Sequence, residues 1–274
     1  MPVIGSDSEI LKEYLGPNAL GNVYLGSTQV QFGEVPVIET PYYWFDPSVN
    51  AFETSWTSSN AASAIDGELT VYKSNNVLQK SEPPTKYYDL SGVSDQIQSG
   101  TTMSELDFAN TNPQGKTFIW WINVDEADYT QGYGSAAILV NGTSNINWTI
   151  NLAQNAQGTG SYFRPDGNAI AAGTDVAIPY SGSNEWVMMA MNVYTEGDNQ
   201  VKIKGYLNDT NVTDYNSGEQ FSTETVNRLL IGYADVGPVS NESRSKIGDV
   251  LIYTSSLDDG EISQTYKALK PKYV

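Results

Sequence analysis

Two stretches of this sequence are apolar at successive positions rather than at alternating ones. Residues 117–124 read TFIWWINV, and residues 186–194 read WVMMAMNVY. A strand with apolar side chains at neighbouring positions is buried on both faces, as an inner strand of a sandwich is. We therefore expect both stretches to lie in the middle of a sheet that is covered on both sides.

Further strand patterns follow one another along most of the chain. Clusters of Gly, Asn and Asp separate them at the spacing that antiparallel sheets require. The fold class that this pattern predicts is all-β, with two antiparallel sheets packed as a sandwich. The predicted strands are 42–45, 67–72, 117–124, 135–140, 145–152, 185–194, 200–206, 227–232 and 245–253.

The N-terminal residues have a different character. Capping-box spacing predicts a short helix at 6–16, and alternating apolar residues predict a small hairpin at 22–33. A hairpin of this size does not fold alone. We therefore place a domain boundary near Thr40, between an N-terminal anchoring arm (1–40) and the β-sandwich domain (41–274).

A second short helix is predicted near the end of the chain. Asp258 and Glu261 occupy the N-cap and N3 positions, and Ile262, Tyr266 and Leu269 form an apolar stripe that would face the sandwich. The basic residues at the end of this helix are expected to be solvated and to complement its dipole. They are Lys267, Lys270 and Lys272.

Composition removes several classes of function. The 274 residues include no cysteine and no histidine, which excludes disulfides, zinc-thiolate sites and Ser-His-Asp or Cys-His catalysis. The formal net charge of -18 repels phosphate backbones, so we expect no nucleic-acid partner. No stretch approaches the roughly 18 apolar residues of a membrane span, and the first residues do not resemble a signal peptide. We expect no membrane insertion.

Three segments, in the right order, resemble concanavalin A-like and laminin G-like domains. The first is the aromatic segment PYYWFDPSVN at 41–50, and the second is KYYDLSG at 86–92. The third, at 245–266, is similar to the closing strand and short helix of those domains. The resemblance implies the jelly-roll fold. It implies little about function, because lectins, glycanases, receptor modules and virion proteins share this fold.

The arm contains a second, shorter resemblance. Residues 23–30, VYLGSTQV, are similar to an element near the start of structural proteins of tailed bacteriophages. This implies a virion structural protein in a capsid-decoration or tail position, whose arm binds other virion proteins. We expect a homo-oligomer in the particle, made in the host cytoplasm and located in the virion.

One segment has part of the pattern of a glycan hydrolase. Glycanases of this fold use carboxylates at alternate residues of one strand, so that the acid and the nucleophile share a face. Glu105 and Asp107 have this spacing, but Ala109 stands where a third carboxylate is required. We therefore expect no catalytic residues and no enzyme activity.

A glycan-binding site needs an exposed aromatic ring on which a sugar stacks, with planar polar groups beside it. Two segments that we expect to be loops have this mixture. In both, the aromatic rings would otherwise cover the rim of the sandwich. The candidate residues are Tyr129 and Tyr133 in one segment, and Tyr162, Phe163, Arg164 and Asp166 in the other.

Acidic turns leave room for Ca²⁺, which binds carboxylate and carbonyl oxygens. The candidate ligand groups are Asp125 and Glu126 with Asp128, and Asp46 with Asn50. Neither group has the spacing of an EF-hand loop, so no cofactor is assigned and Ca²⁺ stays open.

Three functions remain open. The first is a non-enzymatic bacteriophage virion protein that displays a jelly roll, with adhesion to host-surface glycans as an added role. The second is a stand-alone carbohydrate-binding, lectin-like module, which is compatible with the first. The third is a glycan hydrolase of the same fold.

Overall fold

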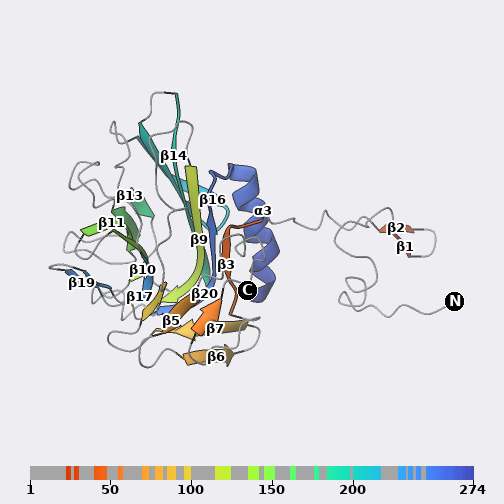
Figure 1. The fold of residues 1–274 in the computed structure, drawn as a ribbon. Helices are drawn as coiled ribbons and strands as arrows, with labels where there is room; N and C mark the ends of the chain where they lie inside the picture. The colour runs from red at the N-terminus through yellow and green to blue at the C-terminus, as the bar shows by residue number, and fades with distance from the viewer. Residues whose placement is uncertain are drawn as a thin grey trace.

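The predicted fold class is confirmed, with two antiparallel sheets and a short helix near the C-terminus (Figure 1). This computed structural model describes six segments with their side chains, and elsewhere the course of individual strands. The six segments are 40–47, 86–90, 115–123, 184–197, 200–216 and 246–274. Within these segments no helix is long and apolar enough to cross a membrane.

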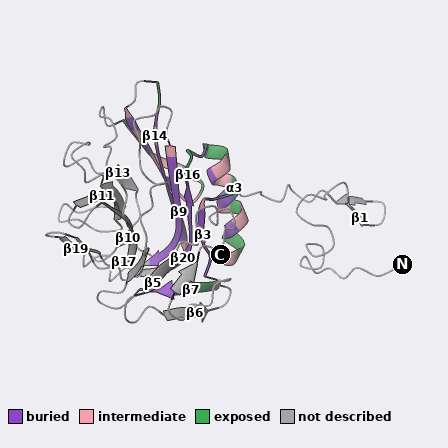
Figure 2. Ribbon diagram, viewed as in Figure 1, coloured by how far each residue is buried: buried purple, intermediate pink, exposed green. Residues whose placement is uncertain are grey.

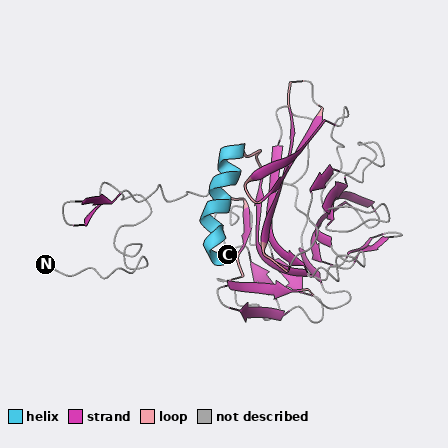
Figure 3. Ribbon diagram, turned by 180° about the vertical axis from the view of Figure 1, so that it is seen from behind, coloured by secondary structure: helices cyan, strands magenta, loops and turns pink. Residues whose placement is uncertain are grey.

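One sheet carries the helix on its outer face, and we call it the helix-side sheet (Figure 3). In spatial order its strands are β16 (Thr210–Asn216), β15 (Val201–Leu207), β14 (Val187–Thr195), β9 (Gly115–Val124), β20 (Ser245–Tyr253), β7 (Thr85–Asp89) and β6 (Leu78–Glu82). A short further strand, β3 (Tyr43–Phe45), pairs with β20 beside β7.

The second sheet lies on the other side of β9 and β14 from the helix (Figure 1). Every predicted strand corresponds to a strand of one of the two sheets, with ends that differ by a few residues. In spatial order the second sheet contains β13 (Val176–Ile178), β12 (Ser161–Arg164), β11 (Asn145–Asn151), β10 (Ser135–Asn141), β17 (Arg228–Gly232), β8 (Gln96–Ser99), β5 (Thr70–Lys73) and β4 (Ser55–Thr57).

Two further pairs of strands form small sheets of their own. They are β1 (Val23–Leu25) with β2 (Thr28–Val30), and β18 (Ala234–Val236) with β19 (Val239–Asn241). The first pair confirms the hairpin expected at 22–33. The helix predicted at 6–16 lies outside the described residues.

The strands β9 and β14 are buried on both faces, as their apolar runs predict (Figure 2). They pair antiparallel, with Trp121 opposite Met188 and Trp120 opposite Met189. Trp121 and Met188 belong to the core cluster beneath the helix. Because successive side chains of a strand point to opposite faces, Trp120 and Met189 point toward the second sheet.

The helix α3 (Asp259–Leu269) closes the outer face of the helix-side sheet. Its N-terminus has the predicted capping box, in which Asp258 accepts from the Glu261 N–H and Glu261 accepts from the Asp258 N–H. Ile262 and Leu269 are buried against the sheet, which confirms the predicted stripe. A 3₁₀ turn, η3 (Lys270–Lys272), then leads the chain back over the sheet.

A β-bulge interrupts β20 where its neighbour changes. Ile247 lies opposite Ile122, whereas Val250 lies opposite Trp120, so β20 has one residue more than β9 over this interval. On its other edge β20 pairs with β7 before the bulge and with β3 after it. The bulge therefore positions Asp249 at the junction of three strands.

Candidate functional site

The side chains of the predicted glycan-binding residues lie outside the part of the chain that the structure describes. Tyr162, Phe163 and Arg164 belong to β12, between β11 and β13, so the loop expected for them is wrong. Their side chains, together with Tyr129, Tyr133 and Asp166, lie outside the described residues. The same holds for the carboxylates Glu105 and Asp107, and for Asp125, Glu126, Asp128 and Asn50.

Asp46 is described, and its partner is a lysine. Its Oδ2 atom accepts a hydrogen bond of 2.8 Å from Lys272 Nζ. The same ammonium lies 3.1 Å from Oδ2 of Asp249, a carboxylate that is fully buried. Lys272 therefore joins Asp46, the residue that follows β3, and Asp249 of β20 to the C-terminal segment. We had expected Lys272 to be solvated, and this expectation is wrong.

Two aromatic side chains complete this cluster. Trp44 Nε1 donates to Asp249 Oδ1 at 2.7 Å. The Tyr273 hydroxyl donates to Asp249 Oδ2 at 2.6 Å and accepts from the Asp249 backbone N–H at 2.6 Å. The bulge would otherwise leave that N–H without a ladder partner. We call the five residues Trp44, Asp46, Asp249, Lys272 and Tyr273 the C-terminal lock.

Aromatic rings surround the lock on the helix side. The Trp121 ring stacks on Tyr273 at a centroid distance of 4.5 Å and on Tyr266 at 5.7 Å. Trp186 also contacts Tyr273, with ring centroids 4.9 Å apart in a tilted arrangement. A Cβ at Gly248 would overlap the Tyr273 ring, so glycine is required there for this close approach.

Two carboxylates of the lock, Asp46 and Asp249, share one ammonium. Burial raises the pKa of Asp249 above its usual value of 3.8, while the adjacent Lys272 opposes this shift. Burial, followed by the charge of Asp249, raises the pKa of Tyr273 well above its usual range. The hydroxyl therefore stays protonated and donates a hydrogen bond to Asp249. Burial also raises the pKa of Tyr88 on β7, and the charges of Asp46 and Asp249 add to the effect.

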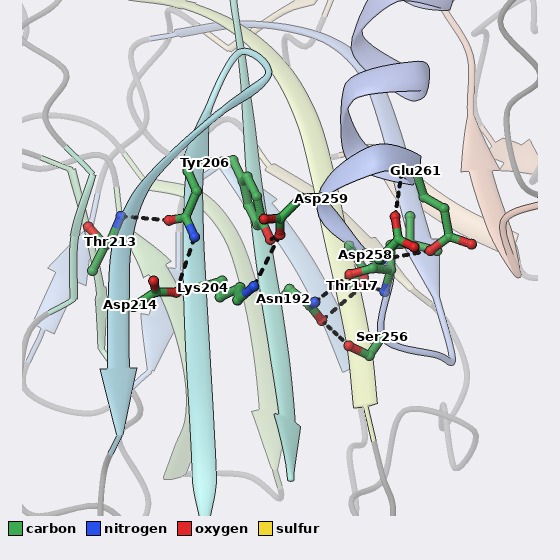
Figure 4. A network of polar contacts seen from close by, with 12 residues as sticks. Thr117, Asn192, Lys204, Tyr206, Thr213, Asp214, Ser256, Asp258, Asp259 and Glu261 are labelled. Carbon is green, nitrogen blue, oxygen red and sulfur yellow. Dashed lines mark hydrogen bonds and ion pairs between the residues drawn. The ribbon is translucent and has the colours of Figure 1, made fainter. Parts of the chain in front are cut away.

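A second polar cluster holds the turn between β20 and α3 (Figure 4). Thr117 Oγ1 accepts from the Leu257 N–H at 2.9 Å, and Asn192 Nδ2 donates to the Leu257 carbonyl at 2.6 Å. Ser256 Oγ donates to Asn192 Oδ1 at 2.9 Å. Both sheet residues are buried, so the turn is fixed by side chains that the helix covers.

The first residue of α3 binds the neighbouring strand β15. Asp259 Oδ1 accepts from the Tyr206 hydroxyl at 2.8 Å and from Lys204 Nζ at 3.1 Å (Figure 4). These hydrogen bonds, first from Tyr206 and then from Lys204, lower the pKa of Asp259 below its usual value of 3.8. The carboxylate is mostly exposed, so its contribution to stability is small.

The lowered pKa of Asp259 predicts a pH dependence. A group whose pKa is lower in the folded state stabilises the fold above its unfolded pKa, and this stabilisation is lost as the pH falls through the folded pKa. The Asp259→Asn variant should be slightly less stable than the parent chain at pH 7 and equally stable at about pH 2. Urea unfolding across this range measures the difference. The control is Glu196→Gln, which removes the ion pair with Lys202 away from the helix. If the difference in unfolding free energy between Asp259→Asn and the parent chain were constant with pH, the lowered pKa of Asp259 would be contradicted.

The chemistry available to the C-terminal lock is limited. Two neighbouring carboxylates can divide acid and base roles, but here one ammonium lies between Asp46 and Asp249. Across the described segments no three acidic side chains gather as a metal site. The lock thus binds the chain end to β3 and β20, and its geometry supports a structural role.

One residue of the lock could have been noticed in the sequence, because its charge does not fit the apolar pattern around it. Asp249 is a charged residue within the otherwise apolar segment 247–253. A buried carboxylate requires partners, so such a residue predicts a cation or hydrogen-bond donors nearby. Its partners come from residue 44 and from residues 272–273, which no local spacing connects.

No protein-family model matches the sequence, and no curated protein is similar to it. Solved structures with the same fold do exist. The binding domain of botulinum neurotoxin serotype C1 superposes with a TM-score of 0.59 at 14% identity, covering 84% of this chain and 52% of that chain. The binding domain of serotype D gives a TM-score of 0.58 at 14% identity, covering 83% of this chain and 50% of that chain.

Related structures include bound complexes. The binding domain of botulinum neurotoxin DC in complex with SialylT has a TM-score of 0.55 at 14% identity, covering 84% of this chain and 52% of that chain. The same kind of domain in complex with rat synaptotagmin II has a TM-score of 0.57 at 16% identity, with coverages of 84% and 52%. This chain spans about half the length of these structures. At such identity the similarity shows a shared β-sandwich fold.

Proposed function

We propose that the jelly roll is a non-catalytic binding module that adheres to glycans on a cell surface. The observation that carries the proposal is that the buried polar groups of the helix-side sheet bind other parts of the fold. Asp249, Asp46 and Asn192 hold the helix and the chain end in place, so these buried groups serve the fold. This supports a binding role over acid-base chemistry for the sheet. The solved structures with a similar fold are named as binding domains, which also supports a binding role for this chain.

A glycan array with the full chain tests this proposal. The array should contain neutral and sialylated oligosaccharides, and we expect reproducible binding to a defined subset of them. Sugar release from the bound oligosaccharides is measured in the same experiment. Release of reducing sugars that is lost in Glu105→Gln would favour the hydrolase. Absence of binding to every oligosaccharide would overturn the adhesive function.

A specific observation favours display of the module on a particle. The β1–β2 hairpin forms a two-stranded sheet of its own and pairs with no other described strand. Hairpins of two short strands are marginal in isolation, so a partner surface would stabilise this one. Together with the resemblance of residues 23–30 to phage structural proteins, this supports a bacteriophage virion protein in a capsid-decoration or tail position.

Deletion of residues 1–35 tests the role of the arm. In the described part of the domain, burial begins at residue 41 and pairing with β20 begins at residue 42, so the shortened chain should keep its far-UV circular dichroism and unfolding midpoint. We expect it to lose co-sedimentation with particles when it is expressed in infected cells. The full chain, expressed in the same way, is the control. Continued assembly of the shortened chain would show that the arm is not the anchor.

A further inference from the structure

The part of the helix-side sheet that the helix does not cover presents side chains in regular rows across three strands. On β14, β15 and β16, Asn192 lies opposite Lys204, which lies opposite Asp214. In the next row, Tyr194 lies opposite Lys202, which lies opposite Asn216. Residues directly opposite each other share a face of the sheet. We call Tyr194, Lys202, Lys204, Asp214 and Asn216 the outer platform.

The outer platform lies on the same face as the helix. Asn192 binds the turn before α3, and Tyr206 binds the first residue of α3 (Figure 4). Tyr194 lies two residues from Asn192 along β14, and Lys204 lies two residues from Tyr206 along β15. A strand places alternate residues on one face. Asn192 and Tyr206 are buried, whereas Tyr194, Lys202 and Lys204 are partly exposed. The cover provided by the helix therefore ends at the boundary of the platform.

Tyr194 is the aromatic residue of this platform. No hydrogen bond joins its hydroxyl to another described residue, in contrast to the hydroxyls of Tyr206 and Tyr273. Burial raises the pKa of Tyr194, and the charges of Lys204, Glu196, Asp214 and Lys202 act on the same hydroxyl. Charged donors and acceptors therefore surround a ring that is partly open to solvent.

These groups fit the chemistry of a sugar. A pyranose ring presents an apolar face that stacks on an aromatic ring and, at its edge, hydroxyls that both donate and accept hydrogen bonds. Lys204 supplies a donor, and the neighbouring carboxylates of Asp214 and Asp259 supply acceptors. The two lysines face three carboxylates, with Glu196 bound to Lys202, so the surface does not favour an anionic sugar.

We propose that the outer platform is a glycan-binding site in which a neutral hexopyranose stacks on Tyr194 and its hydroxyls bind Lys204 and Asp214. The inference rests on the adhesive function proposed above and specifies where the sugar binds. The site lies on the open part of the helix-side sheet, whereas Tyr162, Phe163 and Arg164 belong to β12 of the second sheet.

The test compares two tyrosine variants of the full chain. Tyr194→Ala removes the stacking ring. Tyr215→Ala is the matched control, because Tyr215 on β16 is also partly exposed but lies opposite Ile203, on the other face of the sheet. With the neutral oligosaccharide that binds most tightly on the array as the probe, we expect Tyr194→Ala to lose about tenfold or more in affinity. Tyr215→Ala should lose less than about twofold, and Tyr194→Phe should retain most of the binding.

The outcomes separate the site from the function. If the parent chain binds a neutral oligosaccharide and Tyr194→Ala binds it equally well, the adhesive function stands and the platform is overturned as its site. If only sialylated oligosaccharides bind, the neutral ligand class is overturned. If the parent chain binds none of the array, the function and the site are both overturned. Circular dichroism of Tyr194→Ala must match the parent chain for its loss of binding to support the site.

Discussion

Replacing Trp121 with alanine is expected to lower the free energy of unfolding by about 3–5 kcal/mol. Trp121 is fully buried beneath α3, and its ring stacks on both Tyr266 and Tyr273. Those rings cannot move into the space left by alanine without breaking other contacts, since the Tyr273 hydroxyl is bound to Asp249. Urea unfolding followed by circular dichroism measures the loss, and a loss below about 1 kcal/mol would contradict this packing.

Trp121→Phe is the matched control for this prediction. The indole Nε1 of Trp121 is buried and has no hydrogen-bond partner among the described residues. An unsatisfied buried donor costs about 1–3 kcal/mol, and phenylalanine removes it while keeping an aromatic ring. We therefore expect this variant to lose no more than about 1.5 kcal/mol. A loss equal to that of the alanine variant would show that the indole makes a contact beyond stacking.

The central strands and the final helix were predictable because their patterns are local. The apolar run at 117–124 fixes a strand that is buried on both faces, and the apolar stripe after Asp258 fixes the helix face that meets the sheet. Each of these features is decided by neighbours a few positions away in sequence. These local features were enough to predict an all-β sandwich, because the fold class does not depend on which strands pair with one another.

The C-terminal lock was not predictable in the same way. Its hydrogen bonds join residues separated by 205 positions, as in Trp44 with Asp249, and by 226 positions, as in Asp46 with Lys272. Such pairs become neighbours only after β3 has paired with β20 and the bulge has turned Asp249 toward the helix side. Lys272, seen only as a charge at a helix end, therefore suggested solvent rather than an ion pair.

The outer platform depends in the same way on strand register. The strands that contain Tyr194 and Lys202 were both predicted from the sequence. Their pairing register was not, and a shift of one residue would move every side chain to the other face. Aromatic residues beside polar ones therefore suggested loops, whereas a sheet face provides the same combination from three separate strands.

Replacing Lys272 with methionine is expected to destabilise the fold by about 2–3 kcal/mol at pH 7. Methionine keeps much of the side chain's apolar length but leaves Asp46 and the fully buried Asp249 without their ammonium. Removing one partner of a buried pair costs about 3–5 kcal/mol, and the partial exposure of Lys272 reduces that value. Lys270→Met is the control, because Lys270 only lies over the Tyr266 ring and should cost less than about 1 kcal/mol.

The pH dependence and a double variant identify the buried charge as the cause of that loss. Burial keeps the pKa of Asp249 above its unfolded value, so its unfavourable contribution appears as the pH rises through the folded pKa and is absent below the unfolded pKa. The deficit of Lys272→Met relative to the parent chain should therefore shrink as the pH falls toward about 4. Adding Asp249→Asn removes the buried charge, so the double variant should be more stable than Lys272→Met alone at pH 7. A deficit that is constant with pH, together with additive losses in the double variant, would mean that Lys272 contributes by packing and that the two carboxylates are stabilised without it.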